Sequence, residues 1–231
     1  MVKPVQPSRG SQTFQKVKTA KGRKISSTRW LERQLNDPYV AEAKRMGYRS
    51  RAAFKLIEMD DKLKFFKPGQ RIIDLGAAPG GWTQVAVDRV KSLKGKGIVV
   101  GLDIQEIEAI QGATLLCQDF LEDEAPGLLT DALGGPADVV LSDMAPFTTG
   151  HTPTDHMRIM GMCEVALDFA ADVLVPGGVF VAKVFQGGTE RDLLTLMKRL
   201  FKTVKHVKPP SSRKESAELY VVSQGFKGRT S

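Results

Sequence analysis

The chain has 231 residues, with 34 Lys+Arg against 26 Asp+Glu and a formal net charge of +8. With 42% hydrophobic residues it is too apolar to be mainly disordered, and its 26% charged residues exclude a typical membrane protein. No run of about eighteen apolar residues occurs, so no transmembrane helix is expected. Two cysteines, Cys117 and Cys163, are too few for a disulfide framework or a cysteine zinc site. The aromatic content of 7% argues against extensive base-stacking platforms, so we expect a soluble, intracellular globular protein.

The charge is divided unevenly along the chain. Residues 1–55 hold 14 basic and three acidic residues, 56–197 hold 11 basic and 21 acidic residues, and 198–214 hold seven basic and no acidic residues. Basic segments attract polyanions, of which nucleic acid is the most abundant in a cell. The pattern therefore favours a nucleic-acid partner at the two basic segments, the alternative being solvated surface with a disordered tail.

The first 27 residues carry seven Lys+Arg, no acid and almost no apolar periodicity, which is typical of a flexible basic arm. The arm lacks the apolar run of a secretory signal. A cytoplasmic location is expected, with a mitochondrial transit peptide as the alternative. An N-cap cluster at Ser26-Ser27-Thr28 predicts the start of ordered structure, and residues 28–231 are expected to form a single domain.

The rest of the chain alternates between short apolar runs and helix-like stretches. Continuous runs of valine, isoleucine and leucine predict strands buried on both faces and hence a parallel sheet. The fold class expected is α/β, a doubly wound, mostly parallel seven-stranded sheet that closes with an antiparallel C-terminal hairpin. The predicted strands are 71–75, 98–103, 114–117, 137–143 and 179–185, the hairpin strands 203–208 and 218–223, and the predicted helices 49–58, 81–91, 154–174 and 189–202.

A glycine-rich turn, Asp74-Leu75-Gly76-Ala77-Ala78-Pro79-Gly80-Gly81-Trp82, follows the first predicted strand. Its glycines are spaced G-x-x-x-G-G, whereas dinucleotide-binding folds use G-x-G-x-x-G, and Ala78 stands where a pyrophosphate would meet the backbone. A pyrophosphate ligand is therefore disfavoured. An acidic residue at the start of the loop suits a ligand with positive charge, such as S-adenosylmethionine. The alternative is a turn of purely structural importance.

Two aspartates continue this pattern at the ends of the next two strands. Asp103 stands where a carboxylate accepts from ribose hydroxyls, and Asp119 is placed to bind the adenine amino group. Aspartates also commonly cap turns, so either aspartate alone is only a weak indication of a binding site. Together they predict an adenosine pocket.

Polar side chains also end the fourth and fifth strands. Lys183 lies within an apolar run, where an unpaired ammonium would be costly, so either it reaches the surface or a site requires it. Asp143 ends the preceding strand and Glu218 opens the last one. Because the ends of neighbouring strands meet at one edge of the sheet, the three side chains are expected to lie together.

Lys55, Asp143, Lys183 and Glu218 match, in order, the K-D-K-E tetrad of ribose 2′-O-methyltransferases. With the glycine-rich turn and the segment Ser-Asp-Met-Ala-Pro, residues 26–226 resemble the FtsJ (RlmE-type) methyltransferases of bacterial large-subunit ribosomal RNA. The basic arm is longer than this family core requires, so the resemblance assigns it no role.

The resemblance implies a Rossmann-like methyltransferase fold and transfer of a methyl group from S-adenosylmethionine to a uridine 2′-hydroxyl in the peptidyl-transferase region. The cofactor contacts it implies are Gly80, Trp82, Asp103, Asp119 and Asp143. Lys183 is the expected general base, because burial and neighbouring cations, here Lys55 and the sulfonium, favour a neutral lysine. Asp143 is expected to orient Lys183 and Glu218 to hold both lysines.

The sequence also contains polar residues outside the tetrad and the predicted adenosine pocket, for which we expect other roles. The histidines, His151, His156 and His206, have no nearby cysteines, and no metal site is expected. The loop 147–155 is expected to close over RNA. Arg213, Lys214 and the stretch 198–208 are candidates for phosphate contacts, or else they are solvated surface.

Several alternatives remain open from the sequence. The same chemistry could act on transfer RNA or a messenger cap, because the tetrad reads the hydroxyl and not its context. A base amino methyltransferase is disfavoured because Asp143-Met144-Ala145-Pro146 departs from the D-P-P-Y type. A non-catalytic ribosome-assembly factor is disfavoured by the intact tetrad, and a dehydrogenase by the glycine spacing. Nothing in the sequence requires more than a monomer, and no membrane partner is expected.

Overall fold

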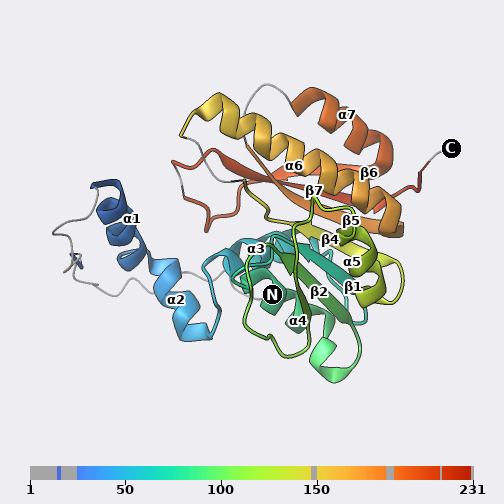
Figure 1. Cartoon of the computed structure of the whole chain (residues 1–231), viewed down its shortest axis with the longest axis horizontal. Coiled ribbons are helices and arrows are strands. Elements are labelled where there is room, and N and C mark those ends of the chain that lie inside the picture. The colour runs from blue at the N-terminus through green and yellow to red at the C-terminus, as the bar shows by residue number, and fades with distance from the viewer. Residues whose placement is uncertain (1–14, 17–24, 147–149, 186–189, 214, 230–231) are drawn as a thin grey trace.

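The computed structural model describes residues 15–16, 25–146, 150–185, 190–213 and 215–229. Within this part, the sheet has seven strands in the order β3-β2-β1-β4-β5-β7-β6 (Figure 1). The strands are β1 (Arg71–Leu75), β2 (Ile98–Asp103), β3 (Thr114–Cys117), β4 (Ala137–Ser142), β5 (Leu174–Phe185), β6 (Phe201–Val207) and β7 (Glu218–Phe226). The helices are α1 (Ile25–Leu35), α2 (Pro38–Met46), α3 (Ala52–Leu63), α4 (Gly81–Val90), α5 (Ala125–Leu133), α6 (Thr152–Val173) and α7 (Glu190–Leu200), with a 3-10 turn at Ser92–Lys94.

The predicted α/β class and the closing hairpin are confirmed. Strands β1 to β5 run parallel, and β7 lies antiparallel between β5 and β6. The chain reverses its order along the sheet at β1, where β2 and β4 lie on opposite sides. In such sheets ligands bind at the carboxyl ends of the strands near that reversal.

The element boundaries differ from the prediction in a few places. Helices α2 and α5 have no counterpart among the predicted helices, and the helix predicted over 49–58 runs from Ala52 to Leu63. The segment of α5 is short and mixes apolar residues with proline and glycine. Helix α1 begins at Ile25, so the expected cap Ser26-Ser27-Thr28 falls inside its first turn. Most of the basic arm, residues 1–14 and 17–24, and Lys214 lie outside the described residues, as do parts of the loop 147–155 and of the predicted helix 189–202.

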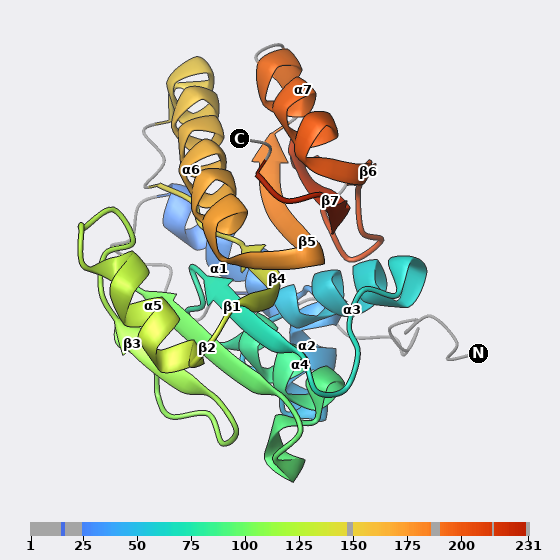
Figure 2. The same ribbon diagram turned by 90° about the vertical axis from the view of Figure 1, so that its right-hand side faces the viewer.

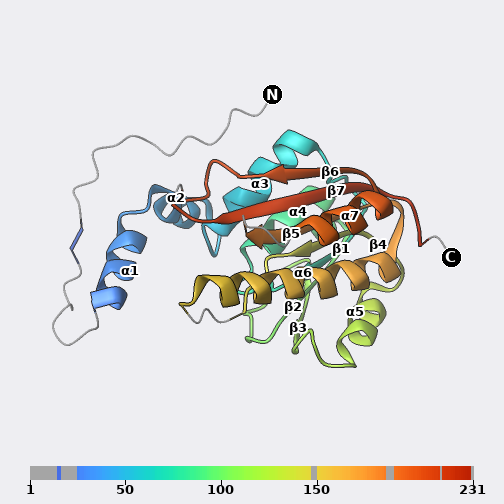
Figure 3. The ribbon, with the colours of Figure 1, turned by 90° about the horizontal axis from the view of Figure 1, so that it is seen from above.

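Helices cover both faces of the sheet (Figure 3). Helices α5, α6 and α7 share one apolar core with the sheet, and α3 and α4 share the other. Figure 2 shows α6 and α7 standing side by side, with β5 and β7 behind them. Strands β1, β2, β4 and β5 are buried from both sides, as the long apolar runs predicted.

Helices α1 and α2 project from the body of the molecule (Figure 1). Asp37 caps α2 by accepting from the backbone N–H of Tyr39 at 3.0 Å. The same carboxylate pairs with Arg51, at the start of α3, and with Arg213 in the β6–β7 connection at 3.4 Å. These ion pairs tie the projecting helices to the region of Lys55.

The glycines of the turn allow close packing around the end of β1. A Cβ at Gly76 (φ +74°) would lie 2.8 Å from the backbone N of Met144, so only glycine lets this loop approach the end of β4. Gly80 (φ +111°) caps α4 in the left-handed region. No helix in the described residues is long and apolar enough to cross a membrane.

Candidate active site

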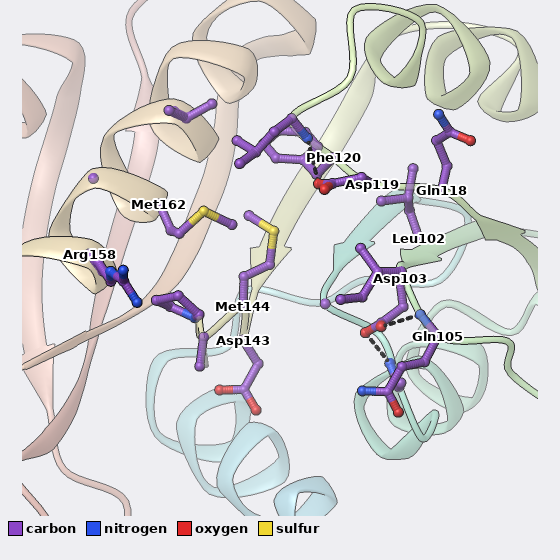
Figure 4. Close-up of a pocket in the computed structure, with 18 residues that line it drawn as sticks. Leu102, Asp103, Gln105, Gln118, Asp119, Phe120, Asp143, Met144, Arg158 and Met162 are labelled. Carbon is purple, nitrogen blue, oxygen red and sulfur yellow. Dashed lines mark hydrogen bonds between the residues drawn. The ribbon is translucent and has the colours of Figure 1, made fainter. Parts of the chain in front are cut away.

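A cavity of about 730 Å³ opens at the carboxyl ends of β1 to β4, where the topology places a ligand. Its wall is formed by the glycine loop, the loops after β2, β3 and β4, and one face of α6 (Figure 4). Three of the predicted cofactor residues line it: Asp103, Asp119 and Asp143. The lining is otherwise largely apolar, which is typical of a pocket for a ligand of nucleoside size.

Asp103 and Asp119 line the cavity, and their carboxylates also accept hydrogen bonds from nearby backbone N–H groups. Asp103 accepts the backbone N–H groups of Ala78 and Gln105, each at 2.9 Å, and so joins the glycine loop to the loop after β2. Asp119 accepts the N–H of Leu121 at 3.0 Å, which is the turn-capping arrangement. Each carboxylate oxygen retains further lone pairs, so these bonds leave acceptor capacity for hydroxyl or amino groups.

Gly80 and Trp82 do not line this cavity. Trp82 is 3% exposed and lies in the core between α3, α4 and the sheet. Its indole N–H donates to the carbonyl of Ala52 at 2.9 Å, and its ring packs 5.5 Å from that of Tyr220. The structure therefore places this side chain beneath the tetrad, and its role in cofactor binding stays a prediction.

Asp74 lies under the glycine loop with no exposed surface. It accepts from the hydroxyl of Thr83 at 2.7 Å, and its other oxygen has no hydrogen-bond partner among the described residues. Burial raises the pKa of this carboxyl to about 7, with a further increase from the charges of Asp143 and Asp103. A cation in the adjacent cavity would favour its ionised form.

The expected neighbours Asp143 and Lys183 are in contact. Ser142 pairs with Ala182 in the β4–β5 register, so the next residues on each strand meet at the sheet edge. The Lys183 ammonium donates to the backbone carbonyl of Asp143 at 2.6 Å and to its Oδ1 at 3.0 Å. Lys183 is therefore paired with a carboxylate at the edge of the cofactor cavity, and it does not extend into solvent as an unpaired charge.

Lys55 and Glu218 form the second ion pair of the tetrad. Lys55 comes from α3, and its ammonium lies 2.5 Å from Oε1 of Glu218, the first residue of β7. Both side chains are less than one-fifth exposed. The two residues are 163 positions apart in the chain, and α3 packs over the sheet so that they meet.

Tyr220 joins the two ion pairs, and it is not among the site residues predicted from the sequence. Its hydroxyl lies 2.9 Å from Oδ1 of Asp143 and 3.1 Å from Oε1 of Glu218, and it accepts from Lys55 at 3.0 Å. The side chain has no exposed surface. Residues two apart on a strand share a face, so a signal is present in the sequence: Tyr220 follows Glu218 by two positions in β7.

The charges of the tetrad set the protonation of its acidic groups. Burial alone would raise the pKa of Asp143, but Lys183, Lys55 and the donated hydrogen bonds outweigh burial and hold that pKa below its usual value. Burial, together with Asp143 and Glu218, raises the pKa of Tyr220 well above its usual value. The site thus keeps a carboxylate and a neutral phenol, which donates to one of its two acceptors at a time.

All four tetrad residues predicted from the sequence meet in one network at the edge of the cavity. The profile of the family described as FtsJ-like methyltransferase matches residues 48–226, which contain this network and the cavity. The chain belongs to this family. S-adenosylmethionine is accordingly its methyl donor, and the fold is that of the Rossmann-like methyltransferases.

Similar proteins carry names in agreement with this membership. The chain is 64% identical to a protein of Paramagnetospirillum magneticum over 96% of this chain and 92% of that one, and 60% identical to one of Rhodospirillum rubrum over 96% and 85%. Both are named ribosomal RNA large subunit methyltransferase E. A crystal structure of a protein described as a putative ribosomal RNA methyltransferase from Plasmodium falciparum is 30% identical, with a TM-score of 0.70, over 79% of this chain and 100% of that one.

Proposed function

We propose that the chain transfers a methyl group from S-adenosylmethionine to the ribose 2′-hydroxyl of a uridine in large-subunit ribosomal RNA. The observation that carries this proposal is the network in which Lys55, Asp143, Lys183 and Glu218 converge around the hydroxyl of Tyr220. It stands at the rim of a cavity of a size and lining suited to the cofactor.

The residues of the cavity fit an adenosine with a charged sulfur substituent. Asp103 and Asp119 offer carboxylate acceptors that hydroxyl and amino groups can use, and Asp143 offers a negative charge. When bound, S-adenosylmethionine supplies an electrophilic methyl group, so the protein needs only to align an oxygen and remove one proton.

Lys183 is the residue proposed to remove the proton from the ribose hydroxyl. A ribose hydroxyl is a weak acid, so a base held within hydrogen-bond distance accelerates its attack. Two acceptors, both on Asp143, already fix the direction of the Lys183 amine. An amine nitrogen held in this way has a defined position toward a hydroxyl placed above the strand end.

Lys55, Glu218 and Tyr220 are proposed to hold that arrangement. Lys55 adds a positive charge close to Asp143 and helps to keep that carboxyl ionised, so that it can orient Lys183. Glu218 fixes Lys55 through their ion pair, and Tyr220 bridges Glu218 to Asp143. A change at any one of these residues is therefore expected to act through the position of Lys183.

Ribosomal RNA as the substrate is supported by the names of the relatives and by the two basic segments of the chain, 1–55 and 198–214, the first of which contains Lys55. The assay that tests it gives the purified chain labelled S-adenosylmethionine with large ribosomal subunits, free large-subunit RNA and transfer RNA. Label in large-subunit RNA and not in transfer RNA is the expected result. Preferential labelling of transfer RNA would overturn the proposed substrate, and no labelling of any RNA would favour the assembly-factor alternative.

A further inference from the structure

Arg49 lies in the turn between α2 and α3, and its side chain is 23% exposed. Its guanidinium donates to three backbone carbonyls that are distant in the sequence. Nη1 contacts the carbonyl of Pro79 at 3.3 Å and that of Glu108 at 2.6 Å, and Nη2 contacts that of Ala109 at 2.9 Å. One arginine thus joins two different loops.

Both loops form walls of the cofactor cavity. The first is the glycine loop, which contributes Gly76 and Ala78 to the lining. The second is the segment 104–113 between β2 and β3, which contributes Ile104 and Gln105. This segment contains no helix or strand, so contacts from outside it determine its position.

The stem of Arg49 also fits against the glycine loop. A Cβ built on Gly80 would lie 3.2 Å from Cδ of Arg49 and 2.5 Å from Cδ1 of Ile110, which belongs to the second loop. Gly80 is therefore enclosed between the arginine and the other loop. Arg49 contacts both Gly80 and the middle of segment 104–113, whose end is held separately by the Ser92 hydroxyl that donates to the carbonyl of Gly112.

The turn that carries Arg49 is itself anchored to α4. The backbone N–H of Arg49 donates to Oε1 of Gln84 at 2.8 Å, and Nε2 of Gln84 donates to the carbonyl of Gly47 at 2.9 Å. The arginine is thus held by its own backbone to the helix that begins at the glycine loop. The backbone of the turn and the glycine-rich turn are thus joined through the same helix.

We propose that Arg49 is a positioning residue for cofactor binding, which holds the glycine loop and segment 104–113 at the spacing that S-adenosylmethionine requires. Both terminal nitrogens of its guanidinium are engaged by carbonyls. This planar fork, and not the positive charge alone, is what the loops need, and a lysine cannot bridge them in the same way. The inference rests on the assignment of the cavity to the cofactor and is independent of the RNA substrate.

The test is calorimetric titration of the full chain with S-adenosylmethionine in the absence of RNA. Arg49→Met and Arg49→Lys are both expected to weaken binding by about tenfold, since neither side chain can donate to both loops at once. Arg89→Met is the matched control, because Arg89 has 29% exposure and pairs with Asp60 and Asp61 at the other end of α4. It is expected to lower Tm and to leave the cofactor affinity within about twofold of wild type.

A second measurement separates loop position from folding. Amide hydrogen exchange is expected to become faster in segment 104–113 of both Arg49 variants and to stay unchanged there in Arg89→Met. Wild-type affinity in Arg49→Lys would overturn the proposal and point to a role for the charge alone. Equal weakening in Arg89→Met would reduce Arg49 to a structural contact.

The cavity assignment is checked in the same titration with Asp119→Ala, since Asp119 lines the cavity and its carboxylate binds the backbone of Leu121, away from the contacts of Arg49. If Asp119→Ala weakens binding and Arg49→Met does not, the proposed role of Arg49 is refuted while the assignment of the cavity to the cofactor stands. Normal binding in both would refute the cavity as the cofactor site.

Discussion

The two regions on either side of Asp143 differ in whether their polar side chains are fully paired with other groups of the protein. On one side is an open cavity, whose carboxylates Asp103 and Asp119 accept from backbone amides and keep further acceptor capacity. On the other side is a closed network in which Lys183, Lys55 and Glu218 already satisfy one another through Asp143 and Tyr220. We propose that the first side receives the cofactor and that the second holds the base in place. Asp143 belongs to both, and in this proposal it connects cofactor binding to catalysis.

The largest expected effect comes from removing the proposed base. Lys183→Ala is expected to lower methyl transfer by about a hundredfold or more, because a positioned base contributes about that much. Binding of S-adenosylmethionine is expected to persist, since Lys183 does not line the cavity. Labelled methyl transfer and calorimetry measure the two effects, and activity within about tenfold of wild type would remove Lys183 from this role.

Asp74, which lies under the glycine-rich turn beside the cavity, is expected to make the stability of the folded chain depend on pH. Its pKa is raised from 3.8 to about 7 in the folded chain, mainly by burial, so near neutral pH the folded state holds a proton that the unfolded state has lost. The stability it contributes is therefore complete below about pH 4 and declines as the pH rises to about 7, by at most about 4 kcal/mol at about 1.36 kcal/mol per unit.

Denaturant unfolding of wild type and Asp74→Asn from pH 5 to pH 8 measures this effect. Wild type is expected to lose more stability than the variant over this range, because the asparagine side chain has no ionisable group. Parallel pH profiles for the two proteins would contradict the buried, protonated state of Asp74.

Asp103→Asn is expected to alter cofactor binding in the cavity and to leave the network around Tyr220 unchanged. An amide can accept only one of the two backbone N–H groups that bind Asp103, and it lacks the negative charge of the carboxylate. If Asp103 binds the cofactor as proposed, the KM for S-adenosylmethionine is expected to rise by about tenfold with kcat at saturation nearly unchanged. Steady-state kinetics at varied cofactor concentration checks this. A fall in kcat with an unchanged KM would place Asp103 in the catalytic step and remove the distinction between the two sides.

Tyr220→Phe is expected to affect the network side and to have the smallest effect. The ring would keep its packing against Trp82, while Asp143 and Glu218 would lose a shared donor. We expect kcat to fall by about fivefold, because a neutral hydrogen bond is worth about 1 kcal/mol. The acidic limb of the pH profile is expected to move to higher pH, because the hydrogen bond from Tyr220 helps to lower the pKa of Asp143. An unchanged pH profile would mean that Tyr220 only fills space.

The fold and three residues of the tetrad could be predicted from local patterns in the sequence, whereas Lys55 is assigned only through the resemblance to the family. Buried strands appear as apolar runs, and Asp143, Lys183 and Glu218 stand at strand ends whose neighbours follow from regular topology. Trp82 is harder to place, because a residue at the start of a helix can face either the ligand or the core. Its position depends on the packing of α3, which no local pattern records.

Arg49 illustrates what local patterns omit. In the sequence it is one of the 14 basic residues of the first 55, with no feature that separates it from the others. Its partners are backbone carbonyls 30, 59 and 60 residues away. Because every residue has a backbone carbonyl, the sequence does not indicate which ones an arginine will contact. Only the folded arrangement distinguishes an arginine that joins two loops from one that attracts RNA.

The central claim is that the closed network activates a ribose hydroxyl. Its most direct test is nucleoside analysis by mass spectrometry of large-subunit RNA after reaction with wild type and with Lys183→Ala. We expect 2′-O-methyluridine as the product of wild type and almost none from the variant. A base-methylated nucleoside from wild type, or equal 2′-O-methyluridine from both proteins, would contradict it.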